Sequence, residues 1–408
     1  MREVEGGVCA PRGFRAGGIW CGIKAGSRKR DLALIYADKP CAAAAMFTSN
    51  RVKAAPVLVS QEHLAGGILR AVIANSGNAN ACTGEAGLAA ARRMAELAAG
   101  EFAIKPGEVA VASTGVIGVP LPIAAIESSI TSLADSIHPG ITGHEAALEA
   151  IMTTDTRKKA AALEFEIGAS TPRLGGMVKG SGMIHPSMAT MLCFITTDAA
   201  ISRELLDRAL RQAVRRSFNR VTVDGDTSTN DTVIIMANGE AGNAPIVSEG
   251  PDYALFSGAL ETLCVKLARS MARDGEGATR LVTVSLKGAA DEAAAELLAR
   301  TVAASSLVKA ACFGADANWG RVLCALGYAG VEFDPAAVDL RFAAAGAEIL
   351  VYRAGAPVSF SEEEAREILS REEIEIRIDL GGGGTGAAVA WGCDLSYDYV
   401  KINGDYRS

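Results

Sequence analysis

A glycine- and proline-rich stretch that leads directly into a run of apolar residues constrains this chain more than any other feature. Residues 179–188 carry two glycines and a proline, and residues 191–195 read Met-Leu-Cys-Phe-Ile. Five consecutive apolar residues, closed by two threonines and an aspartate, predict a buried strand. The glycines allow the loop backbone conformations that other residues resist. Thr190 stands at the junction, so its hydroxyl is expected where a bent loop enters a rigid strand.

That junction suits a nucleophile, although a loop that simply enters a core strand is the more common explanation of the local pattern. A threonine hydroxyl needs a base, and cleavage of the peptide bond before Thr190 would leave a new α-amine beside the hydroxyl to serve as that base. Histidine, the usual base, occurs only at positions 63, 138, 144 and 185. This scarcity argues against a histidine-rich metal site and gives little support to a serine or cysteine hydrolase.

Composition and charge exclude several classes of protein. Apolar residues make up 49% of the chain and charged residues 21%, with a net charge of −7 and a pI near 5.4. An acidic globular chain is not expected to bind nucleic acid or an anionic membrane. No window approaches the roughly 18 uninterrupted apolar residues of a membrane span, and no signal peptide is expected. Nine dispersed cysteines without a Cys-x-x-Cys pair indicate reduced thiols, so we expect a cytoplasmic protein.

Hydrophobic periodicity predicts strands and helices that interleave without strict alternation. The predicted strands are 32–37, 43–47, 56–59, 71–74, 108–113, 191–195, 233–236 and 280–286. The predicted helices are 85–99, 120–134, 143–152, 203–218, 254–273 and 291–312. This pattern indicates an α/β or α+β fold with helices layered on mixed sheets, as two domains or one large layered domain.

Polar, glycine-flanked segments between these elements are the candidates for chemistry. The strand over 108–113 ends at Thr114 and Gly115, which would present a hydroxyl and backbone N–H groups at one point, as an oxyanion hole requires. A glycine-assisted turn is the alternative there. Thr153 begins a hydroxyl cluster that either caps a helix or holds a ligand. Glu276, between two glycines, either binds an ammonium group or is solvated.

Four further segments match known motifs only in part. Segment 75–84 has three asparagines and predicts either side chains bonded to backbone or an ordinary helix start. Segment 221–233 carries three aspartates without the EF-hand spacing, so packed polar turns are expected. Segment 381–386 lacks the lysine of a phosphate loop and lies between two predicted strands, which argues against nucleotide binding. The tail over 397–408 has three tyrosines and is expected to dock.

Taken in chain order, these segments closely resemble the ArgJ family of arginine biosynthesis, also called ornithine acetyltransferase or glutamate N-acetyltransferase. The matching motifs are Asn-Ser-Gly-Asn-Ala-Asn-Ala-Cys-Thr-Gly, Ser-Thr-Gly-Val-Ile-Gly, Thr-Thr-Asp-Thr, Lys-Gly-Ser-Gly-Met-Ile with Met-Ala-Thr-Met-Leu, Asp-Gly-Glu-Gly-Ala-Thr, Phe-Gly-Ala-Asp-x-Asn-Trp-Gly-Arg and Tyr-Val-Lys-Ile-Asn. Each motif alone is weak. Seven in the same order, from the N-terminal region to the last residue, make a strong match.

The resemblance implies a specific site. Family members cut themselves between the alanine and threonine of the Met-Ala-Thr motif, here Ala189 and Thr190, and the freed threonine is the nucleophile that carries the acetyl group as an ester. Thr114 and Gly115 match the oxyanion-stabilising pair. The positions that match substrate-binding residues are Thr153, Lys179, Thr190, Glu276, Asn403 and Ser408.

The resemblance also implies the reaction and the assembly. Acetyl passes from N2-acetyl-L-ornithine to L-glutamate by a ping-pong mechanism, some members also accept acetyl-CoA as donor, and no cofactor or metal is expected. The fold is expected to be of the DmpA-like N-terminal-nucleophile type, with residues 1–189 as the α chain and 190–408 as the β chain of an α2β2 heterotetramer. A related self-cleaving amidohydrolase or aminopeptidase is the alternative, and a non-catalytic binding protein of the same fold is a second one.

The sequence departs from the family pattern at a few positions. His185 and Ser187 stand where alanine and asparagine are expected, and the chain ends in Ser408, where a threonine is usual. Ser408 keeps a hydroxyl and a carboxylate for binding. His185 is expected to be a packed or exposed loop histidine, with tuning of the cleavage as the alternative.

Overall fold

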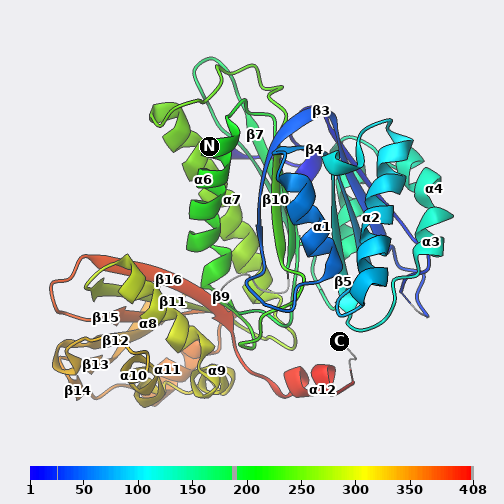
Figure 1. The fold of residues 1–408 in the computed structure, drawn as a ribbon. Helices are drawn as coiled ribbons and strands as arrows, with labels where there is room; N and C mark the ends of the chain where they lie inside the picture. The colour runs from blue at the N-terminus through cyan, green and yellow to red at the C-terminus, as the bar shows by residue number, and fades with distance from the viewer. Residues whose placement is uncertain (25, 186–190, 406–408) are drawn as a thin grey trace.

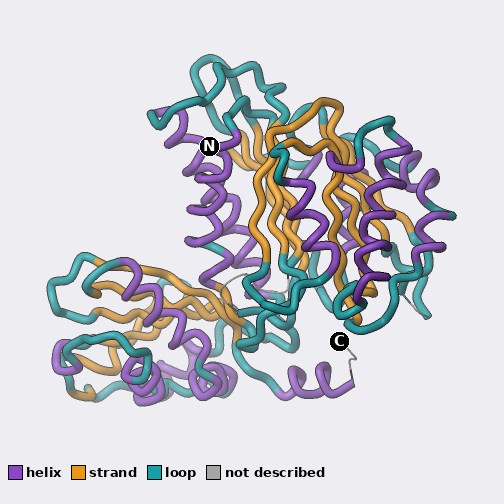
Figure 2. Tube along the Cα trace, in the orientation of Figure 1, coloured by secondary structure: helices purple, strands orange, loops and turns teal. Residues whose placement is uncertain are grey.

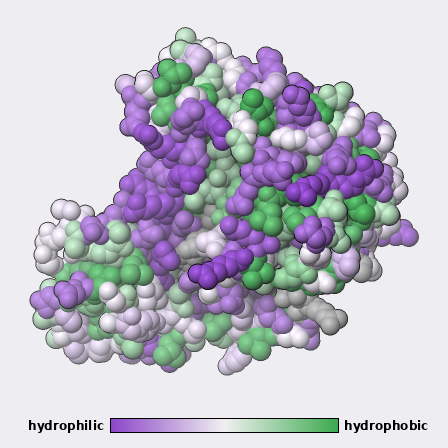
Figure 3. Space-filling view, in the orientation of Figure 1, coloured by the Kyte–Doolittle hydropathy of each residue, from purple (hydrophilic) through white to green (hydrophobic). Residues whose placement is uncertain are grey.

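Two β-sheets with helices packed on them make up the computed structural model, which describes residues 1–24, 26–185 and 191–405. In Figure 1 the first sheet and its helices form the larger upper part of the molecule, and the second sheet forms the smaller lower part. Figure 2 shows the strands of the second sheet lying nearly crosswise to those of the first. In Figure 3 the surface of both parts carries hydrophilic residues interspersed with groups of hydrophobic ones.

Within the described residues the first sheet contains nine strands, and two of them come from the region after residue 190. They are β1 (Arg2–Glu3), β2 (Phe14–Ile19), β3 (Leu32–Phe47), β4 (Ile68–Asn78), β5 (Val109–Val116), β6 (Ala160–Glu164), β7 (Arg173–Lys179), β8 (Leu192–Thr197) and β10 (Thr232–Ala237). Their order is β1-β6-β7-β8-β10-β3-β4-β5, with β2 paired to β3. The pairs β4–β5 and β8–β10 are parallel, so the sheet is mixed.

In the part of the chain that the structure describes, the second sheet contains seven strands, all from the C-terminal half. They are β9 (Val221–Thr222), β11 (Leu281–Ala289), β12 (Asp339–Ala344), β13 (Ala347–Arg353), β14 (Ala356–Pro357), β15 (Glu373–Asp379) and β16 (Gly386–Cys393). Their order is β14-β13-β12-β15-β11-β16-β9. The helices are α1 (Ala55–Leu64), α2 (Gly84–Glu101), α3 (Ile123–Glu127), α4 (Ile130–Asp135), α5 (Gly140–Ile151), α6 (Arg203–Arg216), α7 (Pro251–Arg273), α8 (Glu292–Ala304), α9 (Ser306–Phe313), α10 (Trp319–Gly327), α11 (Glu362–Leu369) and α12 (Tyr397–Asp405).

Helices cover both faces of the first sheet, because its strands are apolar on both faces. On β8, Cys193 and Ile195 belong to the core beneath α6 and α7, whereas Leu192 and Phe194 belong to the core shared with α5. This alternation follows from the period of two in a strand. The predicted strand at 191–195 is therefore confirmed as β8, whose residues are all buried. The predicted fold class, helices layered on mixed sheets, is confirmed as well.

Strand β8 lies in the interior of its sheet. It pairs antiparallel with β7, with Lys179 opposite Leu192, and parallel with β10. Strand β10 in turn pairs antiparallel with β3. The two strands from after position 190 therefore lie side by side between strands from before it, within one hydrogen-bonded sheet. The division between the two sheets falls elsewhere in the chain.

The structure corrects three predicted elements. The predicted strand at 56–59 is wrong, because these residues belong to α1, where Pro56 occupies the first turn, in which its missing N–H is not needed. The predicted helix at 120–134 is divided into the short helices α3 and α4. The predicted helix at 291–312 is interrupted at Ser305, whose hydroxyl accepts a hydrogen bond from Val308 N and caps α9.

The other predicted helices are confirmed as α2, α5, α6 and α7. Segment 75–84 combines both alternatives, since Asn75 Nδ2 donates to the Asn78 carbonyl at 2.9 Å and α2 begins at Gly84. No helix within the described residues is long and apolar enough to cross a membrane.

A buried histidine predicts how stability depends on pH. His144 in α5 is only 2% exposed, and a Cβ at Gly7 would lie 2.2 Å from its ring. Burial lowers the pKa of His144 from 6.5 to about 4. Between these values the unfolded chain binds more protons than the folded one. The stabilisation that comes from neutral His144 is therefore fully present above pH 6.5, and the free energy of unfolding falls by about 3 kcal/mol as the pH drops towards 4.

We therefore expect the thermal unfolding temperature of the wild type to fall more steeply between pH 6.5 and pH 4 than that of His144→Leu. The variant has no group to protonate at this position. Unfolding followed by circular dichroism at several pH values measures the difference, and parallel curves for the two proteins would contradict the assignment.

Candidate active site

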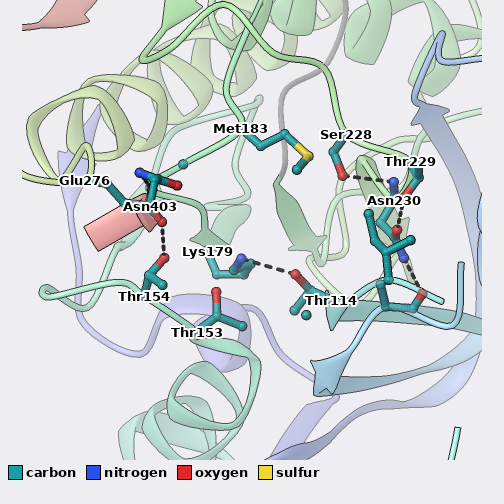
Figure 4. A pocket seen from close by; sticks show the side chains of 14 residues that line it. Thr114, Thr153, Thr154, Lys179, Met183, Ser228, Thr229, Asn230, Glu276 and Asn403 are labelled. Atoms are coloured by element: carbon teal, nitrogen blue, oxygen red, sulfur yellow. Dashed lines mark hydrogen bonds between the residues drawn. The ribbon is translucent and has the colours of Figure 1, made fainter. Parts of the chain in front are cut away.

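One pocket gathers most of the residues that the sequence singled out. Its empty volume, open space at the mouth included, is about 580 Å³. The predicted site residues that line it are Thr114, Gly115, Thr153, Lys179, Glu276 and Asn403 (Figure 4). They come from β5, β7, the segment after α5, the segment after α7, and α12. Ala189, Thr190 and Ser408, with Ser187, lie outside the described residues.

The end of β5 brings a hydroxyl and a glycine to one side of the pocket. Gly115 has a φ of +133°, and a Cβ there would lie 2.3 Å from the carbonyl carbon of Gly77 in the neighbouring β4. Only glycine fits this turn without a shift of the backbone. The adjacent Thr114 is 3% exposed, and Lys179 Nζ donates to its Oγ1 at 3.2 Å. An ammonium group can only donate, so Thr114 keeps its own hydroxyl hydrogen, for which no described residue is an acceptor.

Lys179 is a buried cation with a fixed counter-charge. Burial lowers the pKa of Lys179, while the carboxylate of Asp155 acts in the opposite direction. Burial also opposes ionisation of Asp155, but Lys179 and Lys159 hold the pKa of this carboxyl at about 2. Asp155 Oδ1 accepts hydrogen bonds from Lys159 Nζ at 2.5 Å and Gly180 N at 2.8 Å. The anchored carboxylate therefore supports a positive charge on Lys179 inside the pocket.

A carboxylate defines the other side of the pocket, as Figure 4 shows. Glu276 Oε1 accepts a hydrogen bond from Thr154 Oγ1 at 2.7 Å, and Oε2 accepts one from Asn403 Nδ2 at 2.9 Å. Gly182 makes this position available, because a Cβ there would lie 2.2 Å from Glu276 Oε2. No lysine or arginine of the described chain forms an ion pair with Glu276. Its negative charge is thus oriented by neutral groups and remains available to a cationic ligand.

The C-terminal helix closes this side of the pocket, and the predicted docking of the tail is confirmed for residues 397–405. A Cβ at Gly277 would lie 2.5 Å from Tyr399 N, so the glycine permits a close approach of α12. The Tyr397 ring packs edge-on against Phe313 with 5.6 Å between the ring centres. No residue of α12 is buried, so specific contacts rather than a core hold the helix.

The sequence reasoning missed three polar residues of the pocket, Ser228, Thr229 and Asn230, whereas Thr154 belongs to the hydroxyl cluster that was singled out. The segment over 221–233 does contain the packed turns that were predicted, since Asn230 Nδ2 donates to the carbonyls of Ala79 and Ser113 at 2.7 and 2.8 Å. The position of this segment beside the pocket follows once the pairing of β8 with β10 is known. Strands β8 and β10 are parallel neighbours, so the residues that precede them meet at the same edge of the sheet.

His185, at the limit of the described loop, lies half-buried with Nδ1 3.4 Å from Thr222 Oγ1. Burial lowers the pKa of His185. Within the described ranges, no group of three or more His, Cys, Asp or Glu side chains could hold a metal ion.

Fold and pocket together define a class of protein. A hydroxyl and a glycine turn beside a buried ammonium group can stabilise developing negative charge, and the opposite carboxylate can hold an amine. These are the features of an acyl-transfer enzyme that acts on a small charged substrate.

Comparison with known proteins places the chain more closely. The model of the ArgJ family matches residues 15–408. The chain is 53% identical over 409 residues to arginine biosynthesis bifunctional protein ArgJ of Symbiobacterium thermophilum, covering 100% of both chains. It is 49% identical over 395 residues to arginine biosynthesis bifunctional protein ArgJ 1 of Clostridium acetobutylicum, covering 97% of this chain and 96% of the relative.

Among solved structures, arginine biosynthesis bifunctional protein ArgJ from Bacillus halodurans aligns with a TM-score of 0.50 and 46% identity, covering 52% of this chain and 98% of its own. The chain therefore belongs to the ArgJ family. The predicted resemblance is confirmed, and with it the assignment of the chain to the acyltransferases of arginine biosynthesis.

Proposed function

We propose that this chain moves an acetyl group from N2-acetyl-L-ornithine to L-glutamate, through an acetyl ester on Thr190 in a ping-pong reaction. One observation carries the proposal. A single pocket combines the Thr114–Gly115 turn with the opposite charges of Lys179 and Glu276. Both substrates are amino acids with carboxylate groups, and each also has an ammonium group, on the side chain of N2-acetyl-L-ornithine and on the α-carbon of L-glutamate. A pocket with both signs of charge complements such molecules.

Each polar group has a role in this reaction. The Thr114 hydroxyl and the backbone N–H of Gly115 stabilise the oxyanion of the tetrahedral intermediate. Lys179 binds a substrate carboxylate and Glu276 a substrate ammonium group. Thr153, Asn403 and Ser408 complete the substrate contacts. Once residue 190 is an N-terminus, its α-amine takes the proton from its own hydroxyl as the ester forms.

The reaction requires self-cleavage between Ala189 and Thr190, and the sheet explains how the two products stay together. Strand β8 of fragment 190–408 lies between β7 of fragment 1–189 and β10, and β10 pairs with β3 of fragment 1–189. A cut at 189/190 therefore leaves both chains within one sheet and one core. The matched chain of the Bacillus halodurans relative is aligned over 98% of its length yet spans 52% of this chain, which agrees with a cut near the middle.

The backbone upstream of the cleavage point is held in an unusual conformation. Met183 has a φ of +57°, which is strained for a residue with a side chain. Asp224 accepts hydrogen bonds from Met183 N at 2.6 Å and Ile184 N at 2.8 Å and so fixes this conformation. Strain held by surrounding hydrogen bonds is a feature of functional sites. The strained backbone at Met183 therefore supports the proposed self-cleavage a few residues further along the chain.

The remaining features of the proposal follow the family. We propose an α2β2 assembly of the two fragments in the cytoplasm, with no nucleic acid or membrane partner and no bound cofactor. Acetyl-CoA is a second donor in this proposal, because the two most similar relatives reported above are named bifunctional.

A transfer assay tests the reaction. Purified protein is incubated with N2-acetylornithine, with and without glutamate, and acetate, ornithine and N-acetylglutamate are quantified. We expect N-acetylglutamate and ornithine to form in equal amounts and acetate to be minor when glutamate is present. Acetate release that glutamate does not change would contradict the transferase and indicate a self-cleaving amidohydrolase.

A further inference from the structure

Asp231 is a buried carboxyl group that has no role in the proposed reaction so far. It precedes β10 and is fully shielded from solvent. Its Oδ1 accepts a hydrogen bond from Met191 N at 3.2 Å. That N–H belongs to the peptide bond that joins Thr190 to Met191. The next residue, Thr232, donates its own N–H to the Met191 carbonyl at 3.0 Å. Both polar backbone groups of Met191 are therefore held by two consecutive residues.

The segment that carries Asp231 is itself rigidly held. Thr48 N donates to the Asp231 carbonyl at 2.9 Å, and Thr48 Oγ1 donates to the Ser228 carbonyl at 2.6 Å. Asn230 Nδ2 reaches the carbonyl of Ser113, the residue before Thr114, at 2.8 Å. Asp231 thus contacts the Met191 amide directly, and its neighbour Asn230 connects the same segment to the oxyanion turn. Supporting contacts of this kind fix the relative geometry of reacting groups.

The carboxyl group differs from a purely structural buried aspartate in the same sheet. Asp198, just beyond the other end of β8, uses both oxygens, which accept hydrogen bonds from Arg173 N at 2.7 Å and Arg12 N at 3.2 Å. Asp231 Oδ2 has no hydrogen-bond partner within the described residues. Burial raises the pKa of Asp231 well above 3.8, although Lys179 and nearby hydroxyls act in the opposite direction. A buried acid with one oxygen unmatched is retained at a cost in stability.

We infer that Asp231 is a positioning residue for the proposed acetyl transfer: its hydrogen bond to the Met191 amide fixes the backbone next to Thr190 relative to Thr114 and Gly115. The inference rests on the proposed function. Asp231 acts as a hydrogen-bond acceptor and takes no part in bond making. Its loss leaves the binding residues in place and frees the backbone that carries the nucleophile. A displacement of about 1 Å from attack geometry reduces the rate on the order of 100-fold.

Three variants test the inference: Asp231→Ala, Asp231→Asn and the matched control Asp198→Ala. Steady-state rates are expressed per molecule of cleaved fragment 190–408, so that any change in self-cleavage is counted separately. We expect Asp231→Ala to lower kcat about 100-fold while KM stays within about threefold. Asp231→Asn keeps an acceptor at the same place and recovers most of the rate. Asp198→Ala lowers the unfolding temperature and leaves kcat unchanged.

Other outcomes would overturn the inference. These are a kcat of Asp231→Ala within about threefold of wild type, an equal fall of kcat in Asp198→Ala, or a loss in Asp231→Asn as large as in the alanine variant. If Asp231→Ala does not fold, Asp231→Ser replaces it, because its hydroxyl is one bond too short to reproduce the contact. Failure of the wild type to transfer acetyl would instead contradict the proposed function. The wild-type assay alone reveals this outcome, without any variant.

Discussion

Replacing Thr190 with alanine is expected to leave a single uncut chain of 408 residues and to abolish acetyl transfer. In the proposed mechanism the same hydroxyl attacks the Ala189 carbonyl during cleavage and the acetyl carbonyl during transfer, and cleavage supplies the α-amine that serves as base. Removal of the nucleophile of a covalent mechanism costs on the order of 10⁶-fold in kcat. A denaturing gel and the N2-acetylornithine assay measure both effects on one preparation.

Two further variants make this result specific. Thr190→Ser keeps a hydroxyl and is expected to retain cleavage and part of the transfer rate. Thr153→Val removes another hydroxyl that lines the pocket and is expected to be cleaved like the wild type. Cleavage or wild-type transfer by Thr190→Ala would contradict the assignment of the nucleophile.

Replacing Thr114 with valine is expected to lower kcat on the order of 100- to 1,000-fold with little change in KM, because it removes one donor of the proposed oxyanion hole. Valine has the shape of threonine, so the packing of this buried position is kept. The hydrogen bond from Lys179 Nζ at 3.2 Å is lost as well, and its ammonium group is then left without this acceptor. Steady-state kinetics with N2-acetylornithine and glutamate separate kcat from KM.

The matched control for Thr114→Val is again Thr153→Val. Thr153 is assigned to substrate binding, so its loss raises KM and largely keeps kcat. Equal effects of the two substitutions on kcat, or an effect of Thr114→Val on KM alone, would remove Thr114 from the oxyanion hole.

The local pattern of the sequence predicted correctly the helices and strands whose apolar residues recur at a regular spacing. The run at 191–195 became β8, and the alanine-rich segment after residue 84 became α2. It failed at 56–59, where four apolar residues fit a strand or a helix equally well and the proline in the first turn decides for the helix. It also missed the break at Ser305, which a side-chain cap creates within an otherwise helical pattern.

The site depended on information that no local pattern contains. Glu276 and Asn403 form one hydrogen bond across 127 positions of the chain, and only the family resemblance placed them together beforehand. Ser228, Thr229 and Asn230 were assigned to packed turns, because their role as pocket residues depends on β10 being the parallel neighbour of β8. Pairing of distant strands follows from the whole fold. The contact of Asp231 with the Met191 amide was invisible to the sequence for the same reason.

The most direct test of the acetyl–Thr190 ester is a mass measurement of the intact fragments. The protein is mixed with N2-acetylornithine in the absence of glutamate, denatured in acid and analysed by mass spectrometry. We expect fragment 190–408 to be heavier by one acetyl group located on residue 190, fragment 1–189 to be unmodified, and the added mass to disappear after glutamate is supplied. An active protein that remains uncut, or that carries the acetyl group at any other residue, would contradict the account.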